Sequence, residues 1–312
     1  MNHKMKVFIS TSSFAEYDEL PLKLLSYVDM DVQLNTCGRT LAANECLNLY
    51  EDVDGLIAGT EALTAEVLRS ARNLKVISRC GAGADNIDMN TAKELGIKVY
   101  NTPDAPTQAV AELTVGLMLD VLRGVSLGDR LVRSGVWQKN MGSLLSEKSI
   151  GILGLGRIGR KIVELTQPFN LRYIAWDNAP DRQFAGKYSI ELAGLDELLA
   201  KANIMTIHLP YAVELKGIIG ERELGLMKRD AILLNVARGG LVDEGALYNA
   251  LKAGTLAGAA LDVFEQEPYT GPLTALDNII LTPHVGSYAR EARVDMETQA
   301  ARNLIEGLKD QG

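Results

Sequence analysis

Three kinds of side chain in this sequence could bind an organic acid and move a proton. Arg238 follows an apolar run and precedes two glycines, where its guanidinium could grip a carboxylate through two hydrogen bonds and polarise a carbonyl. The run from Asp262 to Pro268 supplies acids after the next apolar run. An acid that is hydrogen-bonded to a histidine favours the imidazolium form. Each stretch also has an ordinary interpretation, as an arginine at a sheet edge and as a solvated acidic turn.

Histidine is the side chain best suited to proton transfer near neutral pH, and the chain has three. His3 lies near the N-terminus. His208 and His284 each follow the end of an apolar run that resembles a strand. Because parallel sheets bind ligands at the carboxyl ends of their strands, either of these two could lie in a site. A structural, hydrogen-bonded role is the alternative for any single histidine.

A glycine-rich stretch follows the apolar run 149–153. Its glycines, Gly154, Gly156 and Gly159, have G-x-G-x-x-G spacing, and a helical pattern follows them. In a dinucleotide site the first glycine permits a tight turn, the second lets the backbone approach a pyrophosphate, and the third lets the helix pack close to the strand. The pyrophosphate then lies on the free N–H groups at the start of the helix. The stretch therefore predicts a dinucleotide site, and an ordinary glycine-rich turn is the alternative.

An acid after the next strand indicates which dinucleotide binds. Asp177 directly follows the predicted strand 172–176 and lies about 20 residues beyond the glycines. A carboxylate there accepts hydrogen bonds from the adenosine ribose and repels a 2′-phosphate, and no arginine follows immediately. The sequence therefore favours NAD over NADP.

Strand and helix patterns alternate along most of the chain, which predicts two doubly wound parallel sheets. The strands expected in the first part are 6–10, 32–35, 54–58, 75–78 and 98–101. Those expected in the second part are 149–153, 172–176, 204–208, 231–235, 257–262 and 279–281. A last helix over 289–308 has no strand after it, so we expect it to cross back and cover the first sheet.

Three segments around the domain boundary carry further expectations. The loop 79–85 has two glycines whose neighbouring N–H groups could face a carboxylate, although a plain strand-to-helix turn fits equally well. The run 102–106 contains two prolines and is expected to be a linker. The helices that follow, over 108–123 and to about 134, are apolar on more than one stripe. We expect them to be buried at a domain or subunit contact, and Trp137 to pack in the loop after them.

Composition excludes several classes of protein. The chain has 312 residues, which is more than one typical core, and a formal net charge of −8. That charge argues against nucleic acid or an anionic membrane as the main partner. Its three cysteines lack metal spacing, and no signal-peptide pattern or membrane-spanning run is present. We therefore expect a cytoplasmic protein without a metal ion.

These motifs together give the chain a resemblance to the D-isomer-specific 2-hydroxyacid dehydrogenase family. The resemblance covers nearly the whole chain. The shared motifs, in chain order, are RCGAGADNID at 79–88, VAELT at 110–114, GLGRIG at 154–159, HLP at 208–210, ARGGLVD at 237–243, LDVFEQEP at 261–268 and TPHVG at 282–286. It implies a flavodoxin-like substrate domain over 1–102 plus 286–312, and a Rossmann NAD-binding domain over 103–285 that forms a homodimer.

The resemblance also implies catalytic roles for single residues. Arg238 matches the family's substrate-binding arginine, and His284 matches its general acid–base, which also touches the substrate. Glu267, rather than Glu265, matches the acid that pairs with the histidine. The expected reaction moves a hydride between nicotinamide and C2 of a small D-2-hydroxy acid or 2-keto acid.

Binding roles follow from the same resemblance. The backbone of Ala82 and Gly83 would hold the substrate carboxylate. Asp177 would bind the ribose, and Asp262 the nicotinamide amide. The full set of expected cofactor residues is Thr107, Gly154, Gly156, Arg157, Ile158, Gly159, Asp177, His208, Pro210, Ala237, Asp262 and Gly286.

The substrate remains open at this stage. The pattern is closest to the short branch that resembles phosphoglycerate dehydrogenases, so 3-phosphoglycerate and 3-phosphohydroxypyruvate are the first expectation. However, the run 58–63 has no Lys or Arg and one acid, Glu61, where many phosphoglycerate dehydrogenases carry phosphate-binding cations. A glyoxylate or hydroxypyruvate reductase is the alternative. A protein of another class, which senses NAD(H) without turnover, is a further alternative.

Overall fold

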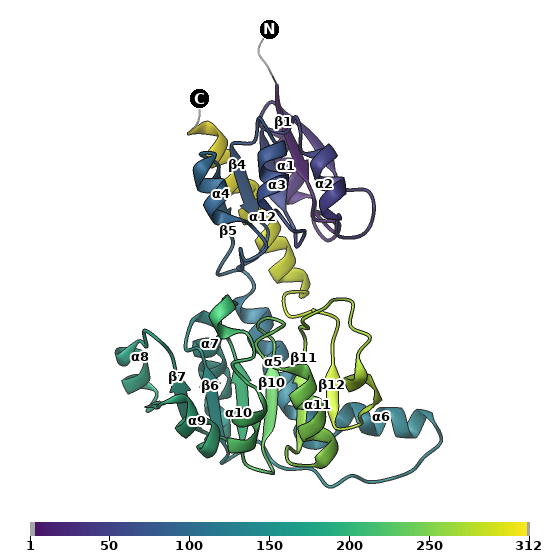
Figure 1. Ribbon diagram of the computed structural model, residues 1–312, viewed down its shortest axis with the longest axis vertical. Coiled ribbons are helices and arrows are strands. Elements are labelled where there is room, and N and C mark those ends of the chain that lie inside the picture. Colours follow the sequence, from purple (N-terminus) through teal and green to yellow (C-terminus); the bar gives the residue numbers. More distant parts are fainter. Residues whose placement is uncertain (1–3, 311–312) are drawn as a thin grey trace. The chain divides into compact units, whose positions relative to one another are not determined.

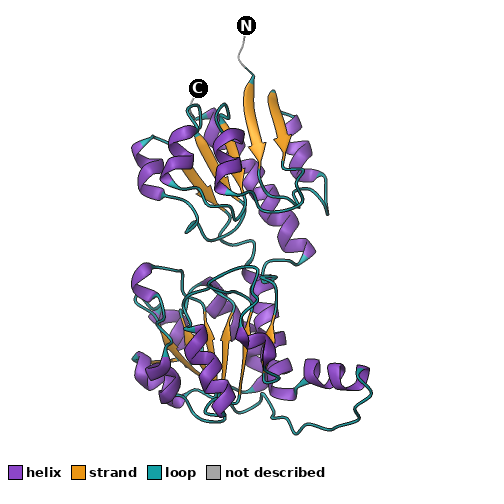
Figure 2. Ribbon diagram, turned by 45° about the vertical axis from the view of Figure 1, so that its right-hand side comes forward, coloured by secondary structure: helices purple, strands orange, loops and turns teal. Residues whose placement is uncertain are grey.

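The computed structural model describes residues 4–310, which form two compact units (Figure 1). One unit comprises the residues up to Pro106 and those from Tyr288 onwards, and the other is Thr107–Ser287. Each unit contains one parallel sheet, and Figure 2 shows helices on both faces of each sheet. The predicted fold class, two doubly wound α/β domains, is therefore confirmed. His3 lies outside the described residues.

The first unit has a five-stranded sheet in the order β2-β1-β3-β4-β5, which is the flavodoxin-like order. Its strands are β1 (Met5–Ile9), β2 (Met30–Leu34), β3 (Gly55–Ala58), β4 (Val76–Arg79) and β5 (Lys98–Asn101). Its helices are α1 (Leu20–Ser26), α2 (Ala43–Leu49), α3 (Ala65–Ser70), α4 (Met89–Glu94) and α12 (Arg290–Lys309).

The last helix, α12, completes the core of this unit. It packs against β3, β4, β5 and α1. Its buried residues Met296, Ala300 and Leu304 share one apolar cluster with Val7 and Val76 of the sheet. The chain before α1 is not helical, because Ala15 has a left-handed backbone (φ 61°) and its N–H donates to a side chain of α12. Helix α1 therefore begins only at Leu20, next to Pro21.

The second unit has a seven-stranded sheet in the order β12-β11-β10-β9-β6-β7-β8. Its strands are β6 (Ser149–Leu153), β7 (Arg172–Trp176), β8 (Glu191–Leu192), β9 (Ile204–Ile207), β10 (Ile232–Asn235), β11 (Gly258–Leu261) and β12 (Ile279–Leu281). The order reverses between β6 and β9, which is the Rossmann switch point where dinucleotides bind. The sequence did not predict β8, because two residues show no alternation.

Helices and short 3-10 turns connect these strands. The helices are α5 (Thr107–Arg123), α6 (Val125–Arg133), α7 (Arg157–Thr166), α8 (Arg182–Lys187), α9 (Leu195–Lys201), α10 (Glu221–Leu226) and α11 (Glu244–Ala253). The 3-10 turns are η1 (Gln167–Phe169), η2 (Val213–Leu215) and η3 (Pro272–Ala275). Helix α5 is buried, and the elements that bury it, α7 and the sheet, belong to its own unit.

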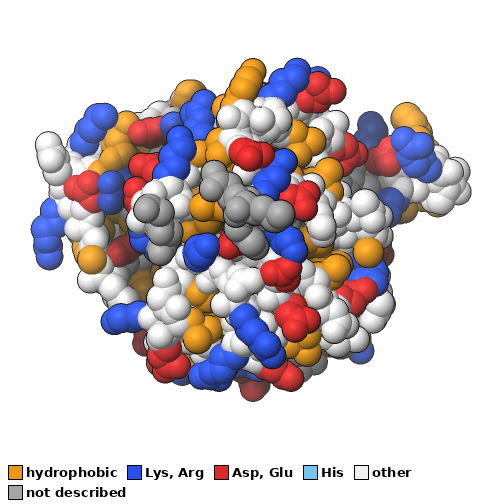
Figure 3. Space-filling view, turned by 90° about the horizontal axis from the view of Figure 1, so that it is seen from above, with side chains coloured by type: hydrophobic (Ala, Val, Ile, Leu, Met, Phe, Trp, Pro, Cys, Tyr) orange, Lys and Arg blue, Asp and Glu red, His pale blue; other side chains and the backbone are white. Residues whose placement is uncertain are grey.

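Helix α6 and the loop after it are not buried within the single chain, so the subunit contact expected for this helix stays a prediction. None of the residues of α6 is buried, and Trp137 in the following loop is 85% exposed. In Figure 1 this segment projects from the sheet of the second unit. Within residues 4–310, no helix has the length and apolar composition that crossing a bilayer requires. Acidic and basic side chains are interspersed on the face of the molecule shown in Figure 3.

Candidate active site

The glycine-rich loop joins β6 to α7 at the switch point of the second sheet. Helix α7 begins at Arg157 with Gly156 as its N-cap, and Ile158 follows in the first turn. A Cβ at Gly159 would collide with the carbonyl oxygen of Gly154, so the helix packs on the turn as closely as a glycine allows. A Cβ at Gly156, by contrast, would meet no atom within 4 Å. The loop thus offers an open approach to the free N–H groups of α7, which suits a pyrophosphate.

Asp177 holds the neighbouring strand end against this loop. Its Oδ2 accepts a hydrogen bond from the N–H of Leu155 at 2.8 Å, and its Oδ1 accepts one from the N–H of Ala179 at 2.8 Å. A carboxylate has further acceptor capacity beyond these two bonds. The side chain is therefore held beside the glycine-rich loop, where a ribose diol would find an acceptor.

Two buried polar atoms near this edge have no hydrogen-bond partner among the described residues. They are Oγ1 of Thr107, at the start of α5, and Nδ1 of His208, directly after β9. Nε2 of His208 lies 2.8 Å from Oγ1 of Thr206. Buried polar atoms without a partner are rare in folded proteins, and a bound group commonly satisfies them. The unpartnered atoms, the open glycine and the placed acid together fit a bound dinucleotide.

The remaining cofactor residues expected from the sequence lie at the same edge. Pro210, Ala237, Asp262 and Gly286 follow β9, β10, β11 and β12, respectively. The N–H of Gly286 donates a hydrogen bond to Oδ2 of Asp262 at 2.8 Å.

His208 should make the second unit less stable at acid pH. Burial lowers the pKa of His208 to about 3, so its imidazole is neutral in the folded protein, while the unfolded chain binds a proton near pH 6.5. The contribution of neutral His208 to the free energy of unfolding is therefore fully present above pH 6.5 and is lost as the pH falls towards 3. Between pH 7 and pH 5 we expect the free energy of unfolding of the wild type to fall by about 2 kcal/mol through this group, and His208→Gln should not show this fall. Urea unfolding followed by the fluorescence of Trp137 and Trp176, both in this unit, measures it. Equal losses in the two proteins would contradict this origin.

A histidine–carboxylate pair lies at the ends of β11 and β12. Nδ1 of His284 is 2.9 Å from Oε2 of Glu267, and Oε1 of Glu267 accepts from the N–H of Phe264 at 3.1 Å. Burial opposes ionisation of the acid. The hydrogen bond and charge of His284, the Phe264 N–H and the charge of Arg238 nevertheless lower the pKa of Glu267 below its ordinary value.

The ionised acid determines the tautomer of the histidine. An ionised carboxylate only accepts hydrogen bonds, so Nδ1 of His284 carries the hydrogen. Nε2 then remains available to exchange a proton with a ligand. The pair is about 40% exposed, which leaves this nitrogen accessible.

Arg238 lies on the loop after β10, next to the loop that holds Glu267. One of its guanidinium nitrogens donates to the carbonyl of Ala237 at 2.7 Å, and Asn235 donates to the carbonyl of Arg238 at 2.8 Å. A Cβ at Gly239 would collide with the backbone carbonyl of Phe264. This close approach of the two loops brings the positive charge of Arg238 near Glu267. The structure thus gathers a guanidinium, a carboxylate and an imidazole at one sheet edge.

Comparisons with known proteins identify the family. The family model "D-isomer specific 2-hydroxyacid dehydrogenase, NAD binding domain" matches residues 115–286. The chain is 41% identical over 312 residues to a glyoxylate reductase of Aeropyrum pernix, covering 96% of this chain and 92% of that protein. It belongs to the D-isomer specific 2-hydroxyacid dehydrogenase family. The expected resemblance is thereby confirmed, as is NAD as the cofactor of its dinucleotide domain.

Two further relatives show the range of the family. A D-3-phosphoglycerate dehydrogenase of Methanocaldococcus jannaschii is 41% identical over 275 residues, covering 86% of this chain and 52% of that protein. The chain thus spans about half the length of the phosphoglycerate dehydrogenases that it matches. The crystal structure of a Thermus thermophilus protein superposes with a TM-score of 0.89 at 34% identity, covering 98% of this chain and 97% of the other.

In this family member the loop after β4, in the first unit, is held from two sides. Thr102 accepts from the N–H of Gly81 at 2.8 Å through Oγ1 and donates its own N–H to the carbonyl of Gly81 at 3.0 Å. Nδ2 of Asn101 donates to the carbonyl of Ala82 at 2.7 Å. Because the N–H and C=O of a trans peptide point in opposite directions, the N–H of Gly83 is directed away from Asn101.

These contacts revise one expectation about the domain boundary. The sequence indicated a linker at 102–106, yet Thr102 is buried and holds the loop expected to bind the carboxylate. Asn101 and Thr102 were missed because their role depends on β4 and β5 pairing side by side. Strand pairing does not show in a local pattern, so the sequence carried no signal for it.

Proposed function

We propose that this protein is an NAD-dependent oxidoreductase that transfers a hydride between nicotinamide and C2 of a small 2-hydroxy acid or 2-keto acid. The observation that carries this proposal is the pair of His284 and Glu267, 2.9 Å apart at the carboxyl edge of an NAD-binding sheet. A histidine that is held by an ionised acid and lies next to an arginine can donate a proton to a carbonyl while that carbonyl is reduced. The functional domains remain proposed as 1–102 plus 286–312 for the substrate and 103–285 for NAD.

The chain's own residues then perform the following steps. Arg238 binds the carboxylate of the keto acid and polarises its carbonyl, and the N–H groups around Ala82 and Gly83 bind the carboxylate as well. NADH, when bound, supplies the hydride that C2 receives. His284 gives the proton at Nε2 to the carbonyl oxygen, while Glu267 stabilises the imidazolium before this transfer. The oxygen becomes the hydroxyl of the 2-hydroxy acid, and oxidation follows the same path in reverse.

An acid in the first unit supports a proposal for the substrate class. Glu61, in the loop after β3, is only 2% exposed. Its Oε1 accepts from the hydroxyl of Ser10 at 2.5 Å and from that of Tyr50 at 3.3 Å. Burial and the charge of Glu61 raise the pKa of Tyr50 well above its ordinary value, so this hydroxyl remains a donor. The carbonyls of Gly59 and Glu61 accept from Nδ2 of Asn86, which joins this loop to the loop after β4.

The carboxylate of Glu61 is thus fixed in a loop joined to the one expected to bind the substrate, where its charge disfavours a phosphate on the substrate. We therefore favour an unphosphorylated acid of two or three carbons, such as glyoxylate or hydroxypyruvate, over 3-phosphohydroxypyruvate. Two basic side chains that a phosphate could use already have partners. Arg133 pairs with Asp129 on α6, and Arg290 donates to the carbonyl of Tyr17.

A panel of 2-keto acids followed by NADH absorbance tests this proposal. We expect kcat/KM for glyoxylate and hydroxypyruvate to exceed that for 3-phosphohydroxypyruvate by about tenfold or more, which corresponds to about 1.4 kcal/mol. Glu61→Gln keeps an acceptor for Ser10 but removes the charge. It should lower the ratio of kcat/KM for the unphosphorylated acids to kcat/KM for 3-phosphohydroxypyruvate. The exposed Glu66→Gln on α3 is the matched control and should leave it unchanged.

Two outcomes would contradict different parts of the proposal. Preference for the phosphorylated acid would overturn the substrate class and leave hydride transfer in place. NADH binding without turnover of any acid in the panel would overturn the enzymatic proposal and favour a protein that senses NAD(H).

A cytoplasmic location stays a prediction from the sequence.

We also propose that the second unit forms a homodimer through the segment 125–144, called here the arm. Its apolar side chains Trp137, Met141 and Leu144 are 85%, 100% and 72% exposed. Apolar side chains this exposed and this close in sequence are typical of a protein contact. Each arm would cover the partner's sheet unit in a two-fold arrangement.

Light scattering after gel filtration measures the dimer. The double variant Trp137→Ser with Met141→Ser should elute as a monomer at concentrations where the wild type has twice the chain mass. Val213→Ser, an exposed apolar residue of η2 outside the arm, is the matched control and should leave the mass unchanged. A monomeric wild type, or an unchanged mass for the double variant, would contradict the proposal.

A further inference from the structure

The backbone at the candidate proton donor has an unusual conformation. His284 has φ 54°, in the left-handed region that few residues other than glycine adopt. Such a conformation persists only where the surrounding structure determines it, and it commonly does so at functional sites. The local bond from the N–H of His284 to the carbonyl of Thr282, at 3.0 Å, closes the turn.

A buried carboxylate lies inside the turn. Asp262, directly after β11, is fully buried. Its Oδ1 accepts from the hydroxyl of Thr282 at 2.6 Å and from the N–H of Val285 at 2.8 Å. Its Oδ2 accepts from the N–H of Gly286 at 2.8 Å. The three donors come from both sides of His284, so one side chain ties down the residues before and after it.

This arrangement gives Asp262 a structural role, and the nicotinamide contact expected from the sequence stays a prediction. A carboxylate engaged by three donors from one turn is oriented by that turn and in return orients it. Hydrogen bonds to a charged acceptor are among the strongest in proteins. Thr282 supplies the only side-chain donor of the three.

We propose that Thr282 and Asp262 form a clamp that sets the orientation of His284, with Thr282 as a positioning residue for proton transfer. This inference rests on the proposed function in so far as His284 is the proton donor. When the hydroxyl of Thr282 is lost, the turn loosens and Nε2 of His284 points less often towards the substrate carbonyl. The clamp therefore acts on kcat rather than on cofactor binding.

Thr282→Val removes the hydroxyl at nearly constant volume and tests the clamp. We expect kcat for the preferred keto acid to fall by about 10- to 100-fold, as for loss of a hydrogen bond to a charged group. The dissociation constant of NADH should change by less than about twofold. Thr282→Ser keeps the donor and should restore kcat to near the wild-type value. The exposed Thr274→Val in η3 is the matched control and should behave as the wild type.

Amide hydrogen exchange gives a readout that does not depend on activity. Val285 and Gly286 should exchange faster in Thr282→Val than in the wild type or in Thr282→Ser, because their N–H groups bond to the released carboxylate. If Thr282→Val does not fold, Thr282→Ala removes the same hydroxyl without a second branch and must show the same changes.

Several results would overturn the clamp. One is that Thr282→Val keeps both the kcat and the amide hydrogen exchange of the wild type. Another is weaker NADH binding with unchanged kcat at saturation, which would indicate a cofactor role instead. A third is equal loss in Thr282→Ser, which would show that volume rather than the hydroxyl matters. If the wild type reduces no keto acid, the proposed function fails, and the exchange experiment still decides whether the clamp exists.

Discussion

Replacing His284 by alanine is expected to lower kcat for 2-keto acid reduction by about 10²- to 10⁴-fold, because proton donation by a placed side chain contributes that much. Nε2 of His284 is the nitrogen left free by the bond from Nδ1 to Glu267. The binding of NADH, measured by fluorescence titration, should remain, since the glycine-rich loop and Asp177 are formed by other segments.

Variants of the two neighbouring acids separate the roles of charge and proton donation. Glu267→Gln keeps the side-chain shape but no longer stabilises an imidazolium, so kcat should also fall, and by less than in His284→Ala. Glu265→Gln is the matched control, because Glu265 is exposed and pairs with Lys216 rather than with the histidine. Near-normal turnover in His284→Ala with NADH bound would exclude His284 as the proton donor.

The largest stability effect is expected in the first unit, at a buried ion pair on α12. Arg293 donates to Oε1 of Glu297 at 2.6 Å and to the hydroxyl of Ser13 at 3.0 Å. Oε2 of Glu297 accepts from the N–H of Ala15 at 2.8 Å. Both charged side chains are nearly inaccessible, and burial raises the pKa of Glu297 above its ordinary value. The pair therefore ties the bend before α1 to the last helix.

Arg293→Met should lower the free energy of unfolding of the first unit by about 3–5 kcal/mol, because it leaves a buried acid without its partner. Urea unfolding followed by far-UV circular dichroism measures the change, and hydrogen exchange of residues 11–19 locates it. Adding Glu297→Leu to Arg293→Met should recover much of the loss, since it removes the unpaired acid.

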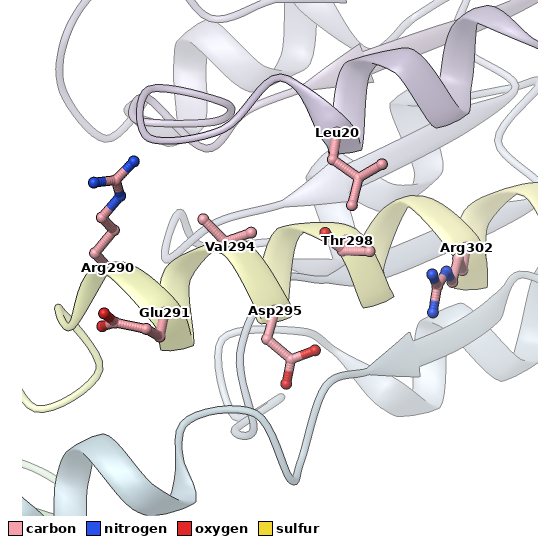
Figure 4. A pocket seen from close by; sticks show the side chains of 7 residues that line it. All are labelled: Leu20, Arg290, Glu291, Val294, Asp295, Thr298 and Arg302. Carbon is pink, nitrogen blue, oxygen red and sulfur yellow. The ribbon is translucent and has the colours of Figure 1, made fainter.

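Arg302→Met is the matched control on the same helix. Arg302 is exposed and lines an open groove with Leu20 of α1 and Thr298 of α12, as Figure 4 shows. A surface substitution of this kind changes stability by about 0.5 kcal/mol or less. If Arg293→Met were as stable as Arg302→Met, the buried pair would not contribute to the stability of this unit.

Much of the fold could be predicted because its signals are local. Strands buried on both faces form short apolar runs, and the switch to helical spacing after the glycines marks the dinucleotide loop. Arg238, Glu267 and His284 stand in such local motifs and were nominated from the sequence. The contact expected for helix α6 stays a prediction, because an apolar helix in a core and one at a chain–chain contact have the same pattern.

The sequence by itself determined the fold class, the dinucleotide site and the preference for NAD, because each depends on residue types at short and regular spacing. The roles of Glu267 and His284 came from the resemblance to the family. Only the tertiary structure decided how those residues are held. The bonds from Thr282 to Asp262, from Ser10 to Glu61 and from Asn101 to Ala82 join different segments. The physical reason is that such bonds depend on which strand ends meet at a sheet edge, and strand order is a property of the whole packed sheet.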